Sequence, residues 1–347
     1  MSRFKPAEET RKLQVTGGST YIISLPKRWI TQNQLGKGSV ITIRGEDGGA
    51  LSIIPSDATA KQESDEAVIR VSPKEISSSI IRKTVSTYLV GYNLINIRAD
   101  KQQQLSPKQR NDIKEFVRRM LVGTEIVIDA PSELKLQVLL SYPELSVQSA
   151  LRRMCIITSS MHKDAITALK ELDYQTAKGI IATDNEVDRF NLYIVRQLKT
   201  AIQNPRIIKE IGLANARDCL GYRLVTKSVE RTADHAANIA ENVLLIKKRL
   251  NAETLERVEK MSAISVSMFE TAIEALFKQD FNLAESVVEK IKDVVSLEKE
   301  VITSFQKTES EESTNLRLII ESIRRTAEYA SDVAEIVLNL TITSIIE

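Results

Sequence analysis

Cysteine, histidine and aromatic side chains are scarce in this chain of 347 residues, which has two cysteines, two histidines and 5% aromatic residues. The cysteines, Cys155 and Cys219, form neither a disulfide framework nor a metal-binding spacing. Runs of 18 apolar residues and a signal peptide are also lacking, so we expect a cytoplasmic protein without membrane insertion. Few aromatic residues beside many aliphatic ones are typical of helical bundles.

Positive charge is concentrated near the N-terminus. Residues 1–45 contain eight lysines and arginines and two glutamates, a balance of +6, whereas the whole chain carries +2 and the remainder therefore −4. The low total excludes a uniformly basic coat for nucleic acid. A basic head on a slightly acidic body instead indicates that the head is the part that meets an anionic partner.

Residues 1–57 are predicted to form a small β domain. Strand-forming segments alternate with tight turns at Gly17-Gly18 and at Asp47-Gly48-Gly49. Short strands in so small a segment bury little apolar core, which favours pairing with a second chain. The stretch from Gly17 to Thr20 lacks the spacing of a phosphate-binding P-loop, and no long helix follows it.

Two stretches of this head, 17–29 and 35–43, resemble the AbrB/SpoVT swapped-hairpin family. The resemblance covers residues 11–55 and implies an intertwined, dimeric β-barrel, often a transcription regulator whose basic residues face DNA. A charged, solvated edge strand is the alternative explanation for two of the basic residues, Lys27 and Arg28. The predicted DNA contacts are Arg11, Lys12, Lys27 and Arg28.

After a charged linker, residues 66–145 predict a small two-layer α/β module in the order βαβαββ. Segments 72–75 and 106–109 both read Ser-Pro-Lys followed by Glu or Gln, a typical helix start. Gly91 and Gly123 are the matching stops. The module lacks a catalytic cluster, so we expect a spacer or dimerisation module, with a ligand sensor as the alternative.

Residues 147–347 predict long amphipathic helices that repeat. A shift of 107 residues matches, for example, Met154 to Met261, and near the end of each half the shift becomes 94. The register changes because the loop near Asn204-Pro205 is longer than its counterpart. Each repeat is predicted to form three long helices, and the pair a six-helix bundle with pseudo-two-fold character. The repeats cover about 147–250 and 253–347. On the long helix predicted for 221–245, small apolar residues recur at helical spacing and form a stripe that allows close packing of neighbouring helices: Val225, Val229, Ala233, Ala236, Ala240 and Val243.

Carboxylates recur at i and i+4 on two predicted helices of the first repeat. Asp184 and Asp188 share a face of one helix, and Glu230 and Asp234 share a face of the other. Acidic side chains at this spacing repel unless a cation lies over them. Two such helices can converge on an oxygen-rich cation site, although a solvated acidic face is the simpler alternative. The candidate ligands are Asp184, Asp188, Glu230, Asp234, Asn238 and Glu241.

The duplicated three-helix unit and its paired acidic motifs are similar to those of the PhoU family of phosphate-uptake regulators. The string from Glu230 to Glu241, ERTADHAANIAE, is very close to that family's motif. The resemblance implies metal clusters on the surface of the helical domain, with iron, zinc or manganese as candidate ions. It also implies control of a phosphate ABC transporter and of phosphate-responsive gene expression.

The second repeat departs from this pattern. Ile291 and Val295 stand at the positions of the first aspartate pair, and Arg324 and Glu328 stand at those of the glutamate–aspartate pair. Two apolar side chains offer no ligand, and an arginine repels a metal ion. We therefore expect metal in the first repeat only.

The spacing of the histidines argues against an enzyme. A ferritin-like oxidase needs two Glu-x-x-His motifs, but Ser159 and Thr232 stand three residues before the two histidines, His162 and His235. Candidates for a Ser–His–Asp or Cys–His set are too few as well. A lone histidine on such helices is most often structural.

These patterns together predict a multidomain, mainly α protein with a swapped-hairpin β head, an α/β module and a six-helix PhoU-like bundle. We expect a non-enzymatic homodimer that binds DNA and couples phosphate status to gene expression and phosphate transport. One alternative is an adaptor that acts on a phosphate ABC transporter or a kinase, with a head that serves only dimerisation. A metal-dependent hydrolase is the distant alternative.

Overall fold

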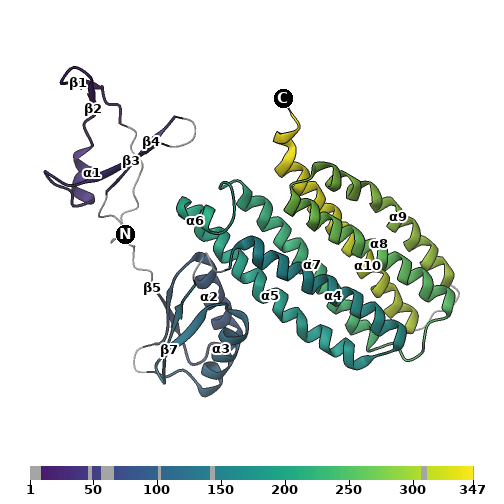
Figure 1. The fold of residues 1–347 in the computed structure, drawn as a ribbon. Coiled ribbons are helices and arrows are strands. Elements are labelled where there is room, and N and C mark those ends of the chain that lie inside the picture. Colours follow the sequence, from purple (N-terminus) through teal and green to yellow (C-terminus); the bar gives the residue numbers. More distant parts are fainter. Residues whose placement is uncertain are drawn as a thin grey trace. The chain divides into compact units, whose positions relative to one another are not determined.

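Two units make up the chain, residues 1–65 and 66–347, each with its own internal contacts. Figure 1 shows short strands and a short helix in the first unit, and a small sheet followed by long helices in the second. This order confirms the predicted sequence of a small β region, an α/β sheet and a mostly helical remainder. The computed structural model describes residues 9–45, 49–55, 66–100, 103–140, 145–305 and 311–346.

The first unit contains two antiparallel hairpins. Strand β1 (Gln14–Thr16) pairs with β2 (Thr20–Ile22), and β3 (Ile41–Gly45) pairs with β4 (Leu51–Pro55). The first turn needs its glycines, because Gly17 and Gly18 have φ of 62° and 86°, a region that other residues rarely adopt.

A short helix, α1 (Lys27–Gln32), follows the first hairpin. The sequence pattern predicts neither a helix nor a strand there. Its signal was Pro26, which precedes the first helical residue and whose carbonyl accepts a hydrogen bond from the Ile30 amide.

Apolar side chains of the first unit are largely open to solvent. Among its described residues, 9–45 and 49–55, Pro55 alone is buried. Large apolar side chains on the strands and turns are more than half exposed, among them Leu13, Val15, Tyr21, Val40, Ile43 and Leu51. The described residues of this unit therefore form no hydrophobic core within a single chain.

The second unit begins with the predicted βαβαββ module. Its sheet has the order β5-β6-β8-β7, in which β5 and β6 are parallel and the other neighbours antiparallel. The apolar faces of the strands and of both helices form one cluster, with Ile95, Ile97 and Leu136 fully buried. The elements are β5 (Glu66–Val71), α2 (Ser77–Val90), β6 (Leu94–Ala99), α3 (Pro107–Met120), β7 (Thr124–Ala130) and β8 (Glu133–Val138).

The two predicted helix starts of the module behave differently. Ser106 caps α3 as expected, because its hydroxyl accepts a hydrogen bond from the Gln109 amide and the Gln109 side chain accepts one from the Ser106 amide. The prediction that α2 begins at Ser72-Pro73 was wrong, since α2 begins at Ser77 after a turn. Its end is as predicted, with Gly91 at φ 114°.

Six long helices and the short α6 follow in the described residues of 145–346. The helices of the first repeat are α4 (Val147–Glu171), α5 (Tyr174–Gln203), α6 (Pro205–Glu210) and α7 (Asp218–Val243). Those of the second are α8 (Ala252–Lys278), α9 (Phe281–Phe305) and α10 (Glu311–Thr341), with a 3-10 turn, η2 (Ile342–Ser344), after it. Helix α6 lies in the longer loop that the change of repeat register predicts, and the counterpart predicted near Ser310 falls outside the described residues.

Side-chain caps explain where several of these helices begin. Asp173 Oδ1 accepts hydrogen bonds from the amides of Gln175 and Thr176 at the start of α5. Asn251 Oδ1 accepts one from the Thr254 amide at the start of α8. Each cap satisfies a backbone donor that the helix leaves free at its first turn.

The two repeats pack side by side through α4 with α8 and α7 with α10. Small residues allow the close approach of α7 and α10, since a Cβ atom added at Gly221 would lie 3.0 Å from Leu340 Cδ1. One continuous apolar cluster joins both repeats.

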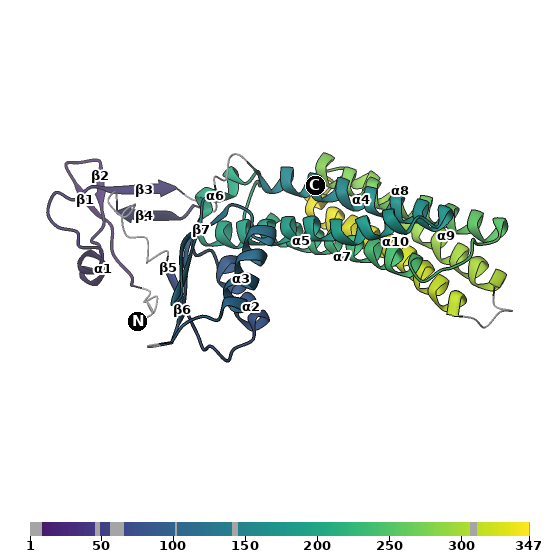
Figure 2. The same cartoon turned by 90° about the horizontal axis from the view of Figure 1, so that it is seen from below.

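Helices α2 and α3 of the α/β module contact α5, so this helix layer lies between the sheet and the bundle (Figure 2). No helix among the described residues is both long and apolar enough to cross a membrane.

Candidate metal centre

Helices α5 and α7 present the predicted acidic residues because their opposite faces are anchored in the core. On α5, Val187 and Ile194 are fully buried, which turns Asp184 and Asp188 away from the core. The α7 stripe is fully buried as predicted and consists of Val225, Val229, Ala233, Ala236, Ala240 and Val243. Packing of α5 against α7 then brings the two acidic faces together.

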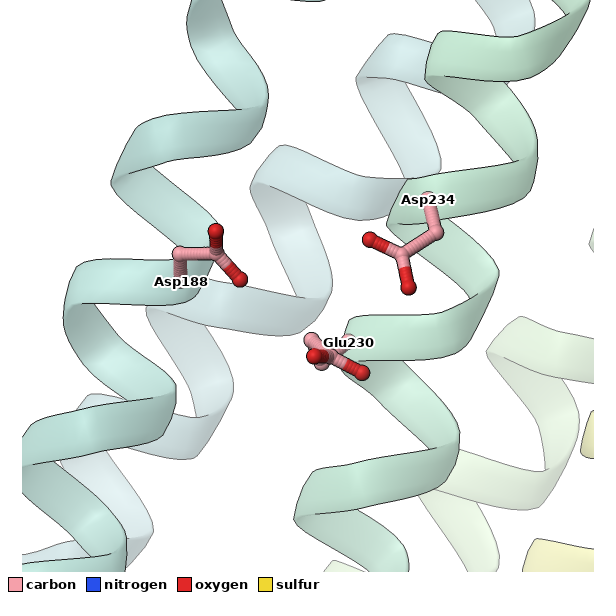
Figure 3. Close-up of side chains that lie close together, drawn as sticks. All are labelled: Asp188, Glu230 and Asp234. Carbon is pink, nitrogen blue, oxygen red and sulfur yellow. The ribbon is translucent and has the colours of Figure 1, made fainter. Parts of the chain in front are cut away.

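Three carboxylates meet between these helices. Asp188 from α5 and Glu230 and Asp234 from α7 each place one oxygen within 4.8 Å of the others. In Figure 3 their side chains point toward one another across the gap between the helices. Such a set of hard oxygen donors suits a divalent or trivalent cation.

Two of the three carboxylates are more buried than a solvated acidic face would be. Glu230 is only 9% exposed and Asp188 is half-buried, whereas Asp234 is exposed. Oxygen Oδ1 of Asp184 is buried and has no hydrogen-bond partner among the described residues. A buried carboxylate oxygen without a partner is costly unless a cation or proton meets it, so the donor set fits a metal ion.

Burial and mutual repulsion disturb the ionisation of the cluster. Burial, followed by the charges of Asp188, Asp234 and Glu230, raises the pKa of Asp184 to about 7. Burial and then Glu230 and Asp188 raise the pKa of Asp234 to about 6. The pKa of Asp188 is raised by burial and by Glu230. The metal-free cluster therefore holds protons at pH values where isolated aspartates have lost them.

Two further candidate ligands lie on α7 beyond the three-carboxylate group. Glu241 is near enough for its charge to raise the pKa of Asp184, after the larger effects of burial and the nearer carboxylates. Asn238 Oδ1 accepts a hydrogen bond from Asn242 Nδ2 at 2.6 Å. The structure thus brings Asp188, Glu230 and Asp234 together most closely and leaves Asn238 engaged within its own helix.

At the corresponding position of the second repeat, an arginine of the chain itself neutralises the carboxylates. The Arg324 guanidinium pairs with Glu298 on α9 at 3.0 Å and with Glu328 on α10. Ile291 packs against the core cluster. A fixed organic cation and apolar side chains therefore replace the acidic residues of the first repeat.

Both histidines lie apart from the acidic cluster. His162 is buried between Ser262 Oγ, 3.0 Å from its Nε2, and Thr326 Oγ1, 3.3 Å from its Nδ1. Burial lowers its pKa to about 4. His235 Nδ1 lies 3.2 Å from Ser322 Oγ. Both rings bridge helices by hydrogen bonds, as expected of structural histidines.

The four basic residues predicted to contact DNA are all exposed on the first unit. Lys27 and Arg28 form the first turn of α1 rather than a strand edge, which removes the edge-strand explanation for them. Arg11 pairs with Glu9.

Sequence reasoning missed two cations that the structure places at important contacts. Lys227 forms an ion pair with Glu230, and only its i, i+3 spacing could have indicated this. Arg196 is 1% exposed on α5 and donates hydrogen bonds to the end of α2 in the α/β module. No local pattern indicates such a contact between distant segments.

The domain is a helical bundle of two three-helix repeats, and the first repeat carries an acidic cluster. Residues 151–243 and 258–337 match the PhoU domain family. The chain belongs to the PhoU family.

Similar proteins of known name are phosphate-transport accessory proteins. The PhoU homologue of the phosphate-specific transport system of Streptococcus pneumoniae TIGR4 is 26% identical over 181 residues, 49% of this chain and 80% of the relative. The homologue of Caulobacter vibrioides NA1000 is 35% identical over 100 residues, 28% of this chain and 40% of the relative. PhoU of Pseudomonas aeruginosa shares the fold, with a TM-score of 0.51 and 20% identity over 57% of this chain and 96% of its own.

The head has its own family. Residues 14–61 match the family of antidote-toxin recognition MazE, a bacterial antitoxin. This domain is of the same swapped-hairpin type as AbrB, which confirms the predicted resemblance.

Proposed function

We propose that this protein is a phosphate-uptake regulator whose head binds DNA, so that phosphate status reaches gene expression as well as phosphate transport. The observation that carries the proposal is the union, in one chain, of a PhoU domain with a basic domain of the MazE type. The named relatives are accessory proteins of phosphate transport, and none of those cited is named as an enzyme. The three functional parts are residues 1–57, 66–145 and 147–347.

The head acts as a homodimer in this proposal. Its described residues bury Pro55 alone, and its strands expose apolar side chains such as Val15 and Leu51. Burying such residues against a second copy stabilises both chains, because each apolar Å² removed from water contributes about 25 cal/mol. A dimer would also present twice as many basic side chains to one DNA duplex as a single head does.

Metal binding at the first repeat is the second element of the proposal. Asp188, Glu230 and Asp234 would hold the ion, with Asp184 and Glu241 near it. The ion would supply positive charge that pulls α5 and α7 together, and iron, zinc and manganese are the candidates. The adaptor, which acts on a transporter or kinase without DNA, shares this site and differs only in the role of the head.

DNA binding separates the regulator from the adaptor. Lysine and arginine contacts to phosphates release counterions, so the affinity for DNA should fall steeply with salt, by about one unit of log–log slope per contact. The variant Lys27→Ala/Arg28→Ala should lower that slope by about two per protomer, or about four for the dimer. Lys247→Ala/Lys248→Ala, a matched pair of exposed cations in the helical part, should leave it unchanged.

The measurement is a gel-shift titration of the full chain on genomic fragments at several salt concentrations, with light scattering to give the mass of the free protein. Wild-type protein that binds no fragment would favour the adaptor. Equal slopes for wild type and the Lys27/Arg28 variant would remove these residues from the interface.

A further inference from the structure

Lys227 is a cation that forms an ion pair with the acidic cluster. It lies on α7 one turn before Glu230, and its Nζ forms an ion pair with Glu230 Oε2. The lysine side chain is 38% exposed, whereas that of Glu230 is 11% exposed. The ammonium group therefore reaches from the surface to the most buried carboxylate of the three-carboxylate group.

The charge of Lys227 acts on the other carboxylates as well. Burial and neighbouring acids raise the pKa of Asp188 and of Asp234, and Lys227 opposes both effects. One lysine cannot neutralise three carboxylates, so the cluster keeps an excess of negative charge and still attracts a cation. The lysine and a metal ion would nevertheless compete for the carboxylate of Glu230.

We propose that Lys227 is a built-in competitor of the metal, which pairs with Glu230 while the site is free of metal and leaves that carboxylate when a metal ion binds. The inference rests on the proposed metal site. It adds that the chain itself sets the concentration at which the site fills, because every binding event must first break the ion pair. It also means that filling the site releases a lysine ammonium group to the surface of α7.

Lysine suits this role better than arginine would. Its compact charge stands on a flexible four-carbon stem and makes no fixed bidentate contact, so it can leave a carboxylate at little cost. The second repeat offers the contrast. There Arg324 is held by Glu298 and Glu328 at once, and the position equivalent to Lys227 is Glu321. A cation held by two carboxylates from two helices is part of the structure rather than a competitor.

An ordinary helix-surface pair is the alternative explanation of the contact. Pairs at i, i+3 on a helix contribute only about 0.2–0.5 kcal/mol to stability and need no further role. The two explanations differ in what removal of the lysine does. Loss of an ordinary pair lowers stability slightly and leaves metal affinity unchanged or lower, whereas loss of a competitor raises metal affinity.

The test is a calorimetric titration of the full chain with Mn²⁺ and, separately, with Zn²⁺. Lys227→Met keeps the length of the side chain and removes its charge, and we expect it to bind metal about tenfold more tightly than wild type, which is about 1.4 kcal/mol. Lys227→Gln should behave alike. Lys227→Arg, which keeps the charge, should not bind more tightly than wild type.

Lys163→Met is the matched control, because Lys163 forms an ion pair with Glu270 at 2.6 Å outside the site. Its metal affinity should equal that of wild type. As a second readout, metal held at a fixed free concentration should raise the melting temperature of Lys227→Met more than that of wild type, since tighter binding stabilises the folded state further.

The possible failures are distinguishable. Metal affinity of Lys227→Met and Lys227→Gln that equals or falls below that of wild type overturns the competitor and leaves the metal site standing. Tighter binding by Lys163→Met as well would reduce the effect to general electrostatics and also overturn it. If neither wild type nor any Lys227 variant binds either metal, the proposed metal site itself fails.

Discussion

The two repeats of the helical domain have similar helices but carry different side chains at the corresponding surface. Leu172 and Gln279, 107 residues apart, end α4 and α8 in the same left-handed conformation, with φ of 56° and 55°. Between α5 and α7 the first repeat gathers carboxylates near a partly exposed lysine side chain, whereas the second closes the matching place with Arg324 and two glutamates. The two repeats are thus similar three-helix scaffolds, and a few side chains make the first one a candidate binding site.

The repeats also differ in their contacts with the α/β module. Arg196 on α5 donates hydrogen bonds to the carbonyls of Tyr88, Gly91 and Tyr92 and to Asn93 Oδ1, which caps the end of α2. Its guanidinium also lies 4.7 Å from the centre of the Tyr88 ring.

At the equivalent place on α9, Thr303 donates only to the backbone of its own helix, at Lys299. The helix that carries Asp184 and Asp188 is therefore also the helix that holds the α/β module.

The largest expected effect is the loss of metal from the first repeat. Asp188→Asn with Asp234→Ala removes two of the three converging carboxylates, so the purified variant should carry no metal after reconstitution with iron, manganese, zinc and magnesium. Glu328→Ala in the second repeat should keep the metal content of wild type. Elemental analysis of the three proteins side by side measures this. Equal metal in all three, or none in wild type, would contradict the asymmetry.

Bound metal should also change the melting temperatures of the two variants differently. Because the ion favours the folded state, the Asp188/Asp234 variant should lack the rise in melting temperature that metal gives to wild type. Glu328→Ala should keep that rise, since the wild-type site remains intact.

The next largest effect concerns the contact of α5 with the α/β module. Arg196→Ala leaves several buried carbonyl groups without their donor, which should cost about 2–4 kcal/mol in the stability of the module against urea. Thr303→Ala should change stability by less than about 0.5 kcal/mol. Hydrogen exchange should quicken in α2 and β6 of the first variant only. Unchanged protection of α2 would mean that the arginine does not hold the module.

A smaller effect is expected from the ion pairs of the second repeat. Arg324→Gln leaves Glu298 without its cation and Glu328 paired with Arg325 alone, and for partly buried groups this should cost about 1–2 kcal/mol. The variant should still bind no second metal ion, because Ile291 and Val295 offer no ligand. Thermal melting and elemental analysis test the two statements. A second equivalent of metal in this variant would mean that the arginine alone had kept the second repeat free of metal.

The smallest effect is a pH dependence of the metal-free protein. Since the pKa values of Asp184 and Asp234 rise to about 7 and about 6 in the folded state, folding takes up protons between about pH 4 and pH 7. The contribution of these two carboxylates to stability should therefore fall as pH rises through this window, because they bind more protons in the folded state than in the unfolded state. The lowered pKa of buried His162 acts in the opposite sense.

Melting temperatures of metal-free protein at pH 5 and pH 7 measure this difference. Asp184→Asn should reduce it, and Asp293→Asn, an exposed position of α9, should not. If the melting temperature of metal-free Asp184→Asn changes between pH 5 and pH 7 as that of wild type does, the raised pKa of Asp184 is contradicted. Metal affinity should change in the opposite sense and rise with pH, since binding displaces protons.

Much of this architecture follows from local patterns along the chain. Helical spacing of small apolar residues predicted the buried stripe of α7, and the change of repeat register from 107 to 94 predicted the longer loop that contains α6. The i, i+4 aspartates and the motif around Glu230 indicated which faces were acidic. A helix rotates about 100° per residue, so relations within one helix can be read directly from the sequence.

Relations between helices were decided by packing alone. The sequence could not say that Asp188 lies within 4.8 Å of Glu230 and Asp234, or that Glu230 is 9% exposed. Nor could it reveal that Arg196 reaches the end of α2, which lies more than 100 residues earlier. Those distances depend on how closely α5 approaches α7 and α2, and that approach depends on the fit of all the core side chains between them.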